Sequence, residues 1–295
     1  MRAVRIHGYG GPEVMHLDEV PTPQPAAGQV LVKVRAASVN PIDWKMRRGV
    51  LKGIFPLTFP RTLGRDCAGE LEGKLVAGVA DPRGDGTHAE YAVLLEASIT
   101  PVPVGLDAAE AASLCIAGLS AWIPLVEVAK VQNGMRVLIH GGAGGVGCHA
   151  IQIARELGAH VVTTSTQADY CRQLGAERVI DYRKEDFAGA GPFDVVLDTL
   201  GGEAHVRSLE ALKPNGVLVA LSATPVPAHA PRADVRIERP AIQATRERLA
   251  QIFDWVVKGR LRPQLSRRFH LEAANDAYAA VEAPHGKGKI VLEIS

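Results

Sequence analysis

The chain has 295 residues, with 33 Lys and Arg against 32 Asp and Glu, so its formal net charge is +1. This balance excludes an electrostatic case for nucleic acid or an anionic membrane, because such partners require a basic surplus. With 47% hydrophobic and 22% charged residues, the composition indicates a globular protein, and the length favours two domains. The four cysteines are far apart, which fits neither zinc-binding spacing nor a disulfide framework and indicates a reducing compartment.

The N-terminal residues predict a strand rather than a targeting signal. Residues 1–6 read MRAVRI, an amphipathic pattern without the apolar core of a signal peptide. The longest uncharged stretch, residues 111–126, is broken by Gly118 and Pro124 and is too short for a membrane span. We therefore expect a soluble cytoplasmic protein with neither a membrane nor a nucleic-acid partner.

The first third of the chain predicts a small β-rich module. Residues 28–37 alternate apolar with charged side chains, which indicates a strand with one buried face. Glycines and prolines interrupt the following residues, and residues 88–95 predict a further strand. Asp107 and Glu110 have the spacing of a capping box, which predicts a helix over residues 107–117.

The middle of the chain alternates predicted strands and helices, which is typical of an α/β fold with a doubly wound parallel sheet. Strands are predicted at residues 136–140, 160–164, 178–180, 194–198 and 216–221. Helices are predicted before Gly158, near residues 170–174 and at 203–212. Farther on, the sequence predicts a loop at 225–231, helices at 241–257 and near 272–281, and a strand at 289–294.

A glycine-rich segment follows the first strand of this series and opens the next helix. Its residues Gly142, Ala143, Gly144, Gly145, Val146 and Gly147 match the pattern G-x-G-x-x-G. Glycines allow a tight turn close to a pyrophosphate, and the helix N-terminus offers N–H groups to that anion. The pattern therefore predicts a dinucleotide site; the alternative is a glycine-rich turn that binds no ligand.

The residues after the second strand of the series favour NADP(H) over NAD(H). NAD-binding proteins place Asp or Glu there to bind the ribose hydroxyl, whereas this chain has Thr164 and Ser165. Hydroxyl groups can donate to a 2′-phosphate and do not repel it. An ordinary polar surface loop is the alternative. Arg172, Tyr182 and Arg183 are further candidate phosphate contacts, equally compatible with a solvated surface.

Several segments carry a resemblance to a known family. They are residues 37–49, 63–69, 86–93, 117–122, 139–158, 174–182, 193–202 and 286–292. Through them the chain resembles, nearly end to end, the zinc-free branch of the medium-chain dehydrogenase/reductase superfamily: NADPH-dependent quinone oxidoreductases and enone or alkenal reductases. The resemblance implies a GroES-like β-rich catalytic domain at residues 1–117 and 259–295, a Rossmann NADP-binding domain at 118–258, and a homodimer.

The zinc ligands of the superfamily's alcohol dehydrogenases are replaced in this chain. By the resemblance, those enzymes carry a Cys in the segment that matches residues 38–43, and Gly-His-Glu where this chain has Gly64, Arg65 and Asp66. Catalytic zinc needs about three protein ligands. We therefore expect no metal, and we interpret Cys67 and Cys115 as core thiols.

The resemblance also implies that Asn40 and Asp43 lie near the nicotinamide ribose, Asn40 as a catalytic and cofactor-binding candidate and Asp43 as a cofactor-binding candidate. By the resemblance, Lys45, a further catalytic candidate, matches a Tyr or Lys that faces the cleft, where its ammonium can stabilise an enolate or bind the nicotinamide ribose. For Lys45 the alternative is a surface charge. Trp44 is a candidate wall of the site, with core packing as the alternative.

Further residues are candidate cofactor contacts. Ser120 matches a Thr or Ser that touches the cofactor in the family. Asp198, Thr199 and Gly201 follow a strand of the parallel sheet, where ligands bind, although Asp198 is equally compatible with a capping role. Lys289 is a candidate within a tail that is also compatible with a simple turn.

The expected function is zinc-independent hydride transfer from NADPH to quinones or α,β-unsaturated carbonyl compounds. A trans-acting enoyl reductase of a biosynthetic pathway is an alternative with the same chemistry. An NADPH-binding sensor or structural protein with little turnover is the alternative from another class. Residues 69–86 are shorter than the family's hairpin, and the segment near residues 225–240 is also short, so these alternatives stay open.

Overall fold

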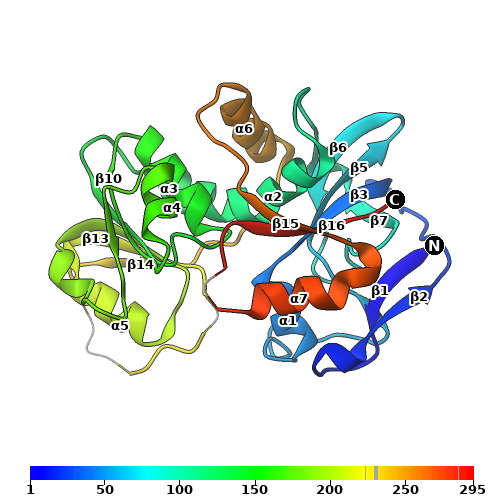
Figure 1. Cartoon of the computed structure of the whole chain (residues 1–295), viewed down its shortest axis with the longest axis horizontal. Helices are drawn as coiled ribbons and strands as arrows, with labels where there is room; N and C mark the ends of the chain where they lie inside the picture. The colour runs from blue at the N-terminus through cyan, green and yellow to red at the C-terminus, as the bar shows by residue number, and fades with distance from the viewer. Residues whose placement is uncertain (223, 229–231, 285) are drawn as a thin grey trace. The chain divides into compact units, whose positions relative to one another are not determined.

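The computed structural model describes residues 1–222, 224–228, 232–284 and 286–295. They form two compact units, each with its own sheet structure (Figure 1). The first unit comprises Met1–Ile116, Ala244–Val257 and Pro263–Ser295; the second comprises Ala117–Gln243 and Lys258–Arg262. The expected domain boundaries stay predictions, and the compact units differ from them mainly in assigning Ala244–Val257 to the first unit.

The first unit is built mainly from strands. Its strands are β1 (Arg2–Ile6), β2 (Met15–Glu19), β3 (Gln29–Val39), β4 (Arg61–Thr62), β5 (Asp66–Leu71), β6 (Lys74–Val79), β7 (Tyr91–Leu95), β8 (Ile99–Pro101), β15 (Leu265–His270) and β16 (Lys289–Glu293). Among the described residues they form a sheet of order β2-β1-β4 and a larger sheet of order β15-β16-β3-β5-β6-β8, with β7 also paired to β3. Its helices are α1 (Pro41–Arg47), α6 (Arg246–Val257) and α7 (Ala274–Glu282), and its 3-10 turns are Pro12–Val14, Glu96–Ser98 and Leu271–Ala273.

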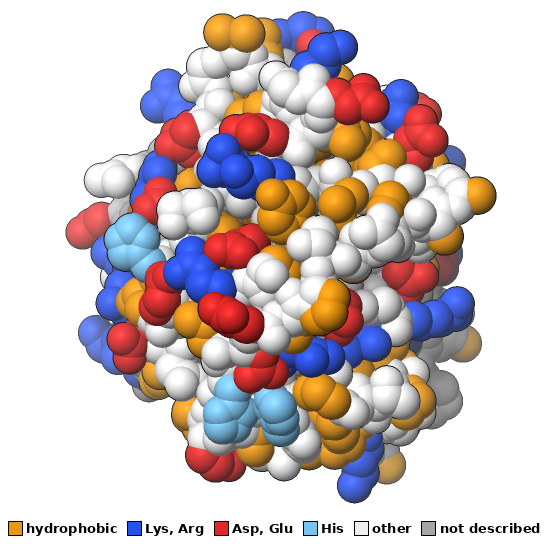
Figure 2. Space-filling view, turned by 90° about the vertical axis from the view of Figure 1, so that its right-hand side faces the viewer, with side chains coloured by type: hydrophobic (Ala, Val, Ile, Leu, Met, Phe, Trp, Pro, Cys, Tyr) orange, Lys and Arg blue, Asp and Glu red, His pale blue; other side chains and the backbone are white. Residues whose placement is uncertain are grey.

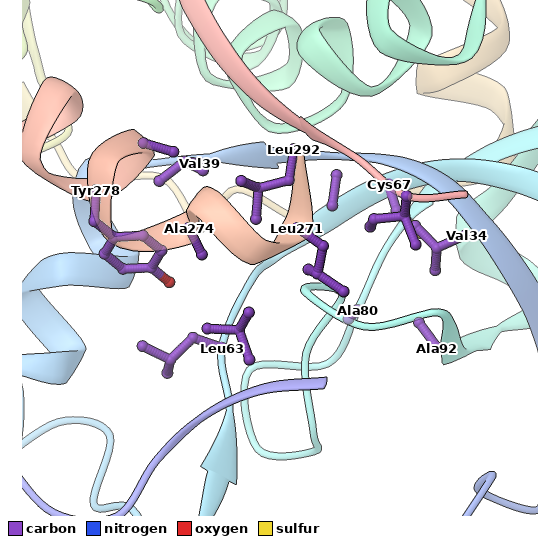
Figure 3. Packing of buried hydrophobic residues seen from close by; sticks show 14 of the residues in the cluster. Val34, Val39, Leu63, Cys67, Ala80, Ala92, Leu271, Ala274, Tyr278 and Leu292 are labelled. Carbon is purple, nitrogen blue, oxygen red and sulfur yellow. The ribbon is translucent and has the colours of Figure 1, made fainter. Parts of the chain in front are cut away.

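The core of the first unit confirms the predicted alternation in β3. Val32 and Val34 are buried in that strand, whereas the intervening Lys33 is only half-buried. Figure 3 shows Tyr278 of α7 and Leu292 of β16 among the residues of this core. One apolar cluster therefore joins α7 to the larger sheet.

The short segment after Gly69 forms a tight hairpin between β5 and β6. The strands pair from Leu71 and Lys74 outward, and the chain reverses at Glu72 and Gly73. These two residues have φ values of 50° and 75°. Positive φ at both central residues is the geometry of the type I′ turn, whose twist matches that of the flanking strands.

The second unit confirms the predicted α/β fold. Its strands are β9 (Arg136–Ile139), β10 (His160–Thr164), β11 (Arg178–Ile180), β12 (Phe193–Asp198), β13 (Leu212–Ala220) and β14 (Arg236–Glu238). Its helices are α3 (Gly147–Glu156), α4 (Ala168–Leu174) and α5 (Gly202–Glu210), with a 3-10 turn at Ala188–Ala190. In the part that the structure describes, all paired strands are parallel, in the order β11-β10-β9-β12-β13-β14. This is the Rossmann strand order.

A long apolar helix follows the predicted capping box. Asp107 Oδ1 accepts the Glu110 N–H at 2.7 Å, and Glu110 Oε2 accepts the Asp107 N–H at 3.1 Å. Helix α2 (Ala108–Trp122) continues into a π-helical segment, Ile123–Val128. The most apolar 18-residue window of these 21 residues has a mean hydropathy of 1.7, so by length and composition the helix is apolar enough to cross a membrane. That corrects the expected short, broken stretch; however, 78% of the apolar window is buried inside the protein.

Several predicted elements differ from the structure at their ends. The helix expected from residue 241 starts at Arg246, because Thr245 caps it by accepting the Arg248 N–H. The strand expected from His88 starts at Tyr91, since His88 bonds to β1 through Val4. Strands β14 and β15 were not predicted, because charged residues hide their alternation. Part of the predicted loop at 225–231 lies outside the described residues.

Charged side chains of both signs are interspersed on the face of the protein in Figure 2. Ion pairs of the first unit include Arg2 with Glu90 at 2.7 Å and Arg35 with Glu70 at 2.8 Å. Exposed pairs of this kind contribute little to stability. Their mixture of signs agrees with the charge balance of the sequence.

The hairpin turn can be tested with two glycines that both have open space around them. Gly73→Ala should lower the free energy of unfolding by about 1 kcal/mol, because an alanine at φ 75° is strained. Gly53→Ala is the control, since Gly53 also has nothing within 4 Å of its built Cβ but lacks a positive φ. Urea unfolding of both variants measures the difference; equal effects would contradict the turn geometry.

Candidate active site

The glycine-rich loop of the second unit connects β9 to α3 and packs tightly against β10. A Cβ on Gly142 would lie 2.1 Å from Thr163 Oγ1, and one on Gly147 would lie 2.2 Å from the Gly141 carbonyl oxygen. Such distances exclude any side chain at these two positions. The predicted pattern therefore has a physical reason in the fold, and the loop fits a pyrophosphate at the N-terminus of α3.

Thr164 and His140 stabilise this loop through hydrogen bonds. Thr164 Oγ1 accepts the Gly141 N–H at 3.2 Å and bonds to His140 Nδ1 at 3.1 Å. His140 Nε2 lies 2.8 Å from Ser208 Oγ, and Ser208 Oγ itself donates to the Ala204 carbonyl. His140 must then donate through Nε2. Burial lowers the pKa of His140 to about 4, which keeps the ring neutral.

This arrangement corrects the expected role of Thr164. Its side chain is buried, and its hydroxyl is engaged by His140 and Gly141 rather than presented to a 2′-phosphate. Ser165 is also buried, and its Oγ accepts the Gln167 N–H at 3.0 Å. Thr166 is the partly exposed hydroxyl residue at this strand end.

The residues after β12 form a second support of the loop. Asp198 is fully buried; its Oδ1 accepts the N–H groups of Leu200 and Gly201, and its Oδ2 lies 2.8 Å from His205 Nδ1. Thr199 Oγ1 donates to the His140 carbonyl at 2.8 Å. The capping alternative for Asp198 therefore matches the structure, and Thr199 and Gly201 lie at the expected strand end.

The remaining predicted cofactor residues of the second unit differ in exposure. Ser120 is buried on α2. Arg172 is exposed and pairs with Asp169 at 3.1 Å, and Tyr182 is half exposed. Arg183, three residues after the end of β11, pairs with Asp181 at 2.8 Å. None of these positions decides between phosphate binding and a solvated surface.

In the first unit, a buried polar cluster lies where β3 ends and β5 begins. Asp66 is fully buried; its Oδ1 accepts Ser38 Oγ at 2.6 Å and Asn40 Nδ2 at 2.8 Å. Its Oδ2 accepts the Ile116 N–H at 2.8 Å. A chain of contacts continues through His88 to Tyr278, since His88 Nε2 lies 3.2 Å from the Ser38 carbonyl and Nδ1 lies 3.0 Å from the Tyr278 hydroxyl.

Lys289 belongs to this cluster and not to an exposed turn. It starts β16, is buried, and donates through Nζ to Asn40 Oδ1 at 2.6 Å and to the Val39 carbonyl at 3.2 Å. The Asn40 side chain is thus bonded on both sides, to a carboxylate and to an ammonium. These two bonds fix the orientation of the Asn40 side chain at the N-cap of α1.

Asp43 and Arg65 each hold a buried polar atom that the cluster leaves unsatisfied. Asp43 Oδ2 accepts the Asn40 N–H at 2.7 Å, whereas Asp43 Oδ1 and Arg65 Nε have no hydrogen-bond partner among the described residues. Burial raises the pKa of Asp43 to about 7 and lowers the pKa of Arg65.

The predicted pair Lys45 and Trp44 lies on α1. Lys45 Nζ is 5.7 Å from the centre of the Trp44 ring, and Arg48 lies 5.5 Å from the same ring. Trp44 is partly buried against the core, which supports its packing role. Burial lowers the pKa of Lys45, so the ammonium is partly desolvated rather than freely solvated.

The donor atoms of the cluster do not suit zinc. Among the described residues, no group of three His, Cys, Asp or Glu side chains could hold a metal ion. The ammonium of Lys289 already bonds to Asn40 Oδ1, and burial raises the pKa of Cys67, which keeps the thiol protonated. Zinc requires deprotonated ligands, so these residues do not fit the ion. The absence of metal stays a prediction.

Sequence reasoning identified the glycine loop but missed Ser38, His88, His140 and Tyr278, and it considered Arg65 and Asp66 only as missing zinc ligands. His140 directly precedes the glycine loop, a position that could have signalled a supporting role. Ser38, His88 and Tyr278 carry no such local signal, because only the pairing of distant strands brings them together.

Two family descriptions match the chain. An alcohol dehydrogenase GroES-like domain matches residues 26–104, and a zinc-binding dehydrogenase domain matches residues 174–292. A chloroplastic quinone-oxidoreductase homolog of Spinacia oleracea is 30% identical, with 99% of this chain and 98% of the relative covered. The chain belongs to the medium-chain dehydrogenase/reductase superfamily, in its quinone oxidoreductase branch.

Other relatives of this branch differ in what they are named for. A trans-enoyl reductase of Aspergillus terreus is 32% identical, over 90% of this chain and 86% of the relative. The quinone oxidoreductase of Coxiella burnetii superposes with a TM-score of 0.89 at 33% identity, covering 100% of this chain and 99% of that one. A mycobacterial protein complexed with NADPH superposes with a TM-score of 0.89 at 28% identity, covering 99% of both chains.

The support that Thr164 gives the loop can be tested by removing its hydroxyl. Thr164→Val leaves the Gly141 N–H and His140 Nδ1 without a partner, which should cost about 1–3 kcal/mol of stability. Dinucleotide affinity should fall equally for NADPH and NADH, because the hydroxyl faces the loop. Fluorescence titration with both dinucleotides measures this, with Thr166→Val as the control. A selective loss of NADPH binding would instead indicate direct phosphate contact.

The raised pKa of Asp43 predicts a pH dependence of stability. The folded protein binds the Asp43 proton more tightly than the unfolded chain, so this contribution is fully present below pH about 4 and is lost as pH rises through about 7. Each pKa unit is worth about 1.4 kcal/mol. Asp43→Asn should therefore lose less stability than the parent protein between pH 5 and 8 in urea unfolding. Asp81→Asn, at an exposed carboxyl, is the control; identical pH slopes for all three proteins would refute the assignment.

Proposed function

We propose that this chain is a zinc-independent reductase that transfers hydride from NADPH to quinones or α,β-unsaturated carbonyl compounds. The observation that carries this proposal is the glycine loop, sealed against β10 and followed by Ser165 and Thr166 instead of a carboxylate. Its membership of the quinone oxidoreductase branch and the NADPH complex of a structural relative support the same assignment.

In this proposal, residues of the second unit bind the dinucleotide and residues of the first unit stabilise charge on the acceptor. NADPH, when bound, supplies the hydride, and one proton from water completes the reduction of the acceptor. In the second unit, the loop N–H groups would hold the pyrophosphate, and the hydrogen bonds of His140, Thr164 and Thr199 fix the loop in place. In the first unit, Lys45 is the candidate cation for the oxyanion that forms on the acceptor, because desolvation strengthens its electrostatic effect.

Zinc independence is supported by the cations of the first unit. Lys289 bonds to Asn40, and Arg65 stands where the superfamily's alcohol dehydrogenases have His. We also propose a cytoplasmic homodimer. Strand β14 lies at the end of its sheet and exposes Ile237, which offers an edge for a second copy. Elemental analysis of the purified protein tests zinc independence, and light scattering tests the homodimer.

A trans-acting enoyl reductase is the second candidate, because a relative of similar identity carries that name. It shares hydride addition to a conjugated double bond but takes a thioester of a carrier. Activity confined to enoyl thioesters would favour it. Tight NADPH binding without turnover of any acceptor would favour a sensor or structural protein.

The decisive experiment measures NADPH and NADH oxidation with matched quinones, enones and enoyl thioesters. We expect turnover of quinones or enones with a preference for NADPH. No turnover in protein that binds NADPH would contradict the reductase proposal.

Cofactor preference can be tested at Thr166, the partly exposed residue after β10. Thr166→Asp should lower kcat/KM for NADPH at least about tenfold relative to NADH, because a carboxylate repels the 2′-phosphate. Thr166→Asn is the neutral control of the same size. An unchanged NADPH-to-NADH ratio in the Asp variant would show that the phosphate lies elsewhere.

A further inference from the structure

Arg65 is a largely enclosed guanidinium that the fold positions but does not pair. Its Nε is buried without a hydrogen-bond partner among the described residues. Among the described residues, no ion pair or hydrogen bond joins its side chain to a carboxylate, although the negative charges of Asp43, Asp66 and Asp81 favour its protonated form. A partly desolvated cation without a hydrogen-bond acceptor is unfavourable.

Arg47 shows how the same fold treats a structural guanidinium. It is fully buried and donates to Glu282 at 2.6 Å, to the Gly10 carbonyl and to the Met15 sulfur. Arg61, four residues before Arg65, donates to the Pro82 carbonyl. Arg65 lacks equivalent acceptors and keeps part of its surface open to solvent.

The backbone around Arg65 is rigid. Gly64 has a φ of 100°, and a Cβ there would lie 2.5 Å from the His88 ring. The Arg65 carbonyl accepts the Ala80 N–H at 2.7 Å, which continues the pairing of β5 with β6. The chain therefore fixes where the guanidinium starts, which is what an anion-binding site requires.

Among the described residues, neither neighbouring carboxylate is hydrogen-bonded to Arg65, and Asp43 Oδ1 is itself without a partner. Asp66 already accepts bonds from Ser38, Asn40 and Ile116, and Asp43 uses Oδ2 for the Asn40 N–H. Burial raises the pKa of Asp43 to about 7, so this carboxyl carries less negative charge than an ordinary aspartate at neutral pH. With Lys289 also present, the cluster can accept an anion.

We propose that Arg65 binds the carboxylate of an acidic acceptor, and that the preferred substrates are conjugated alkenes or quinones that carry a carboxylate group. The guanidinium offers parallel N–H donors that match two carboxylate oxygens. The bond exists before and after hydride transfer, so Arg65 selects and orients the acceptor. This proposal rests on the reductase function proposed above.

A turnover experiment compares an unsaturated carboxylic acid with its methyl ester, and a quinone carboxylate with its ester, at saturating NADPH. We expect the parent protein to favour each acid. Arg65→Met should lower the acid-to-ester ratio of kcat/KM by about 10- to 100-fold, the value of a charged hydrogen bond. Arg65→Lys, a point charge without the fork, should give an intermediate loss. Arg61→Met is the matched control and should leave the ratio unchanged.

A binding experiment separates this proposal from the reductase function. Calorimetric titration of fumarate into protein saturated with NADP⁺ should show binding to the parent and to Arg61→Met. The Kd of Arg65→Met for fumarate should be higher by about tenfold or more. NADPH affinity should be equal in all variants. Added guanidinium should restore acid turnover to Arg65→Ala, which a purely structural role would not allow.

The outcomes are distinct. Absence of turnover with every acceptor contradicts the reductase function, while the titration still decides whether Arg65 binds carboxylate. Turnover with an unchanged acid-to-ester ratio, or fumarate binding that is equal in Arg65→Met, overturns the proposal. If Arg65→Met fails to fold, Arg65→Lys provides both comparisons.

Discussion

The polar end of the first unit depends on the buried carboxylate of Asp66. A carboxylate in this position is tolerated only when donors surround it. Ser38 comes from β3, Asn40 precedes α1, and the Ile116 N–H belongs to α2. Because one charge draws donors from three elements, it fixes the start of α1 and thereby the directions of the side chains that α1 carries.

Two cations near this carboxylate have different consequences. Lys289 donates hydrogen bonds to Asn40 and to the Val39 carbonyl, and these bonds connect the start of β16 to the end of β3. Arg65 is anchored through its backbone but not through its guanidinium. A site that keeps one cation paired and another unpaired is organised before its ligand arrives, and preorganised donors lose less free energy on binding.

The second unit was largely predictable from sequence because its signals are local. Strand and helix alternation, the glycine pattern and Gly158 after α3 each lie within a few residues, and the structure confirms the fold that they predict. Strands β14 and β15 escaped prediction since their charged residues lack a period of two. Thr164 was predicted from its position in the chain, but its hydroxyl direction is set by the register of β10 against β9.

The first-unit cluster shows why the rest could not be predicted. Asn40 and Lys289 are 249 positions apart and meet because β16 pairs antiparallel with β3. The dinucleotide loop recognises its ligand mainly with backbone, so its pattern survives only if glycines stay in place. The cluster uses side chains on a fixed backbone. Arg65, which by resemblance stands where zinc alcohol dehydrogenases have His, is the cation that we propose binds an anion. In this chain, the proposed acceptor specificity therefore depends on a side chain whose backbone is fixed by Gly64 and by the bond from the Ala80 N–H to the Arg65 carbonyl.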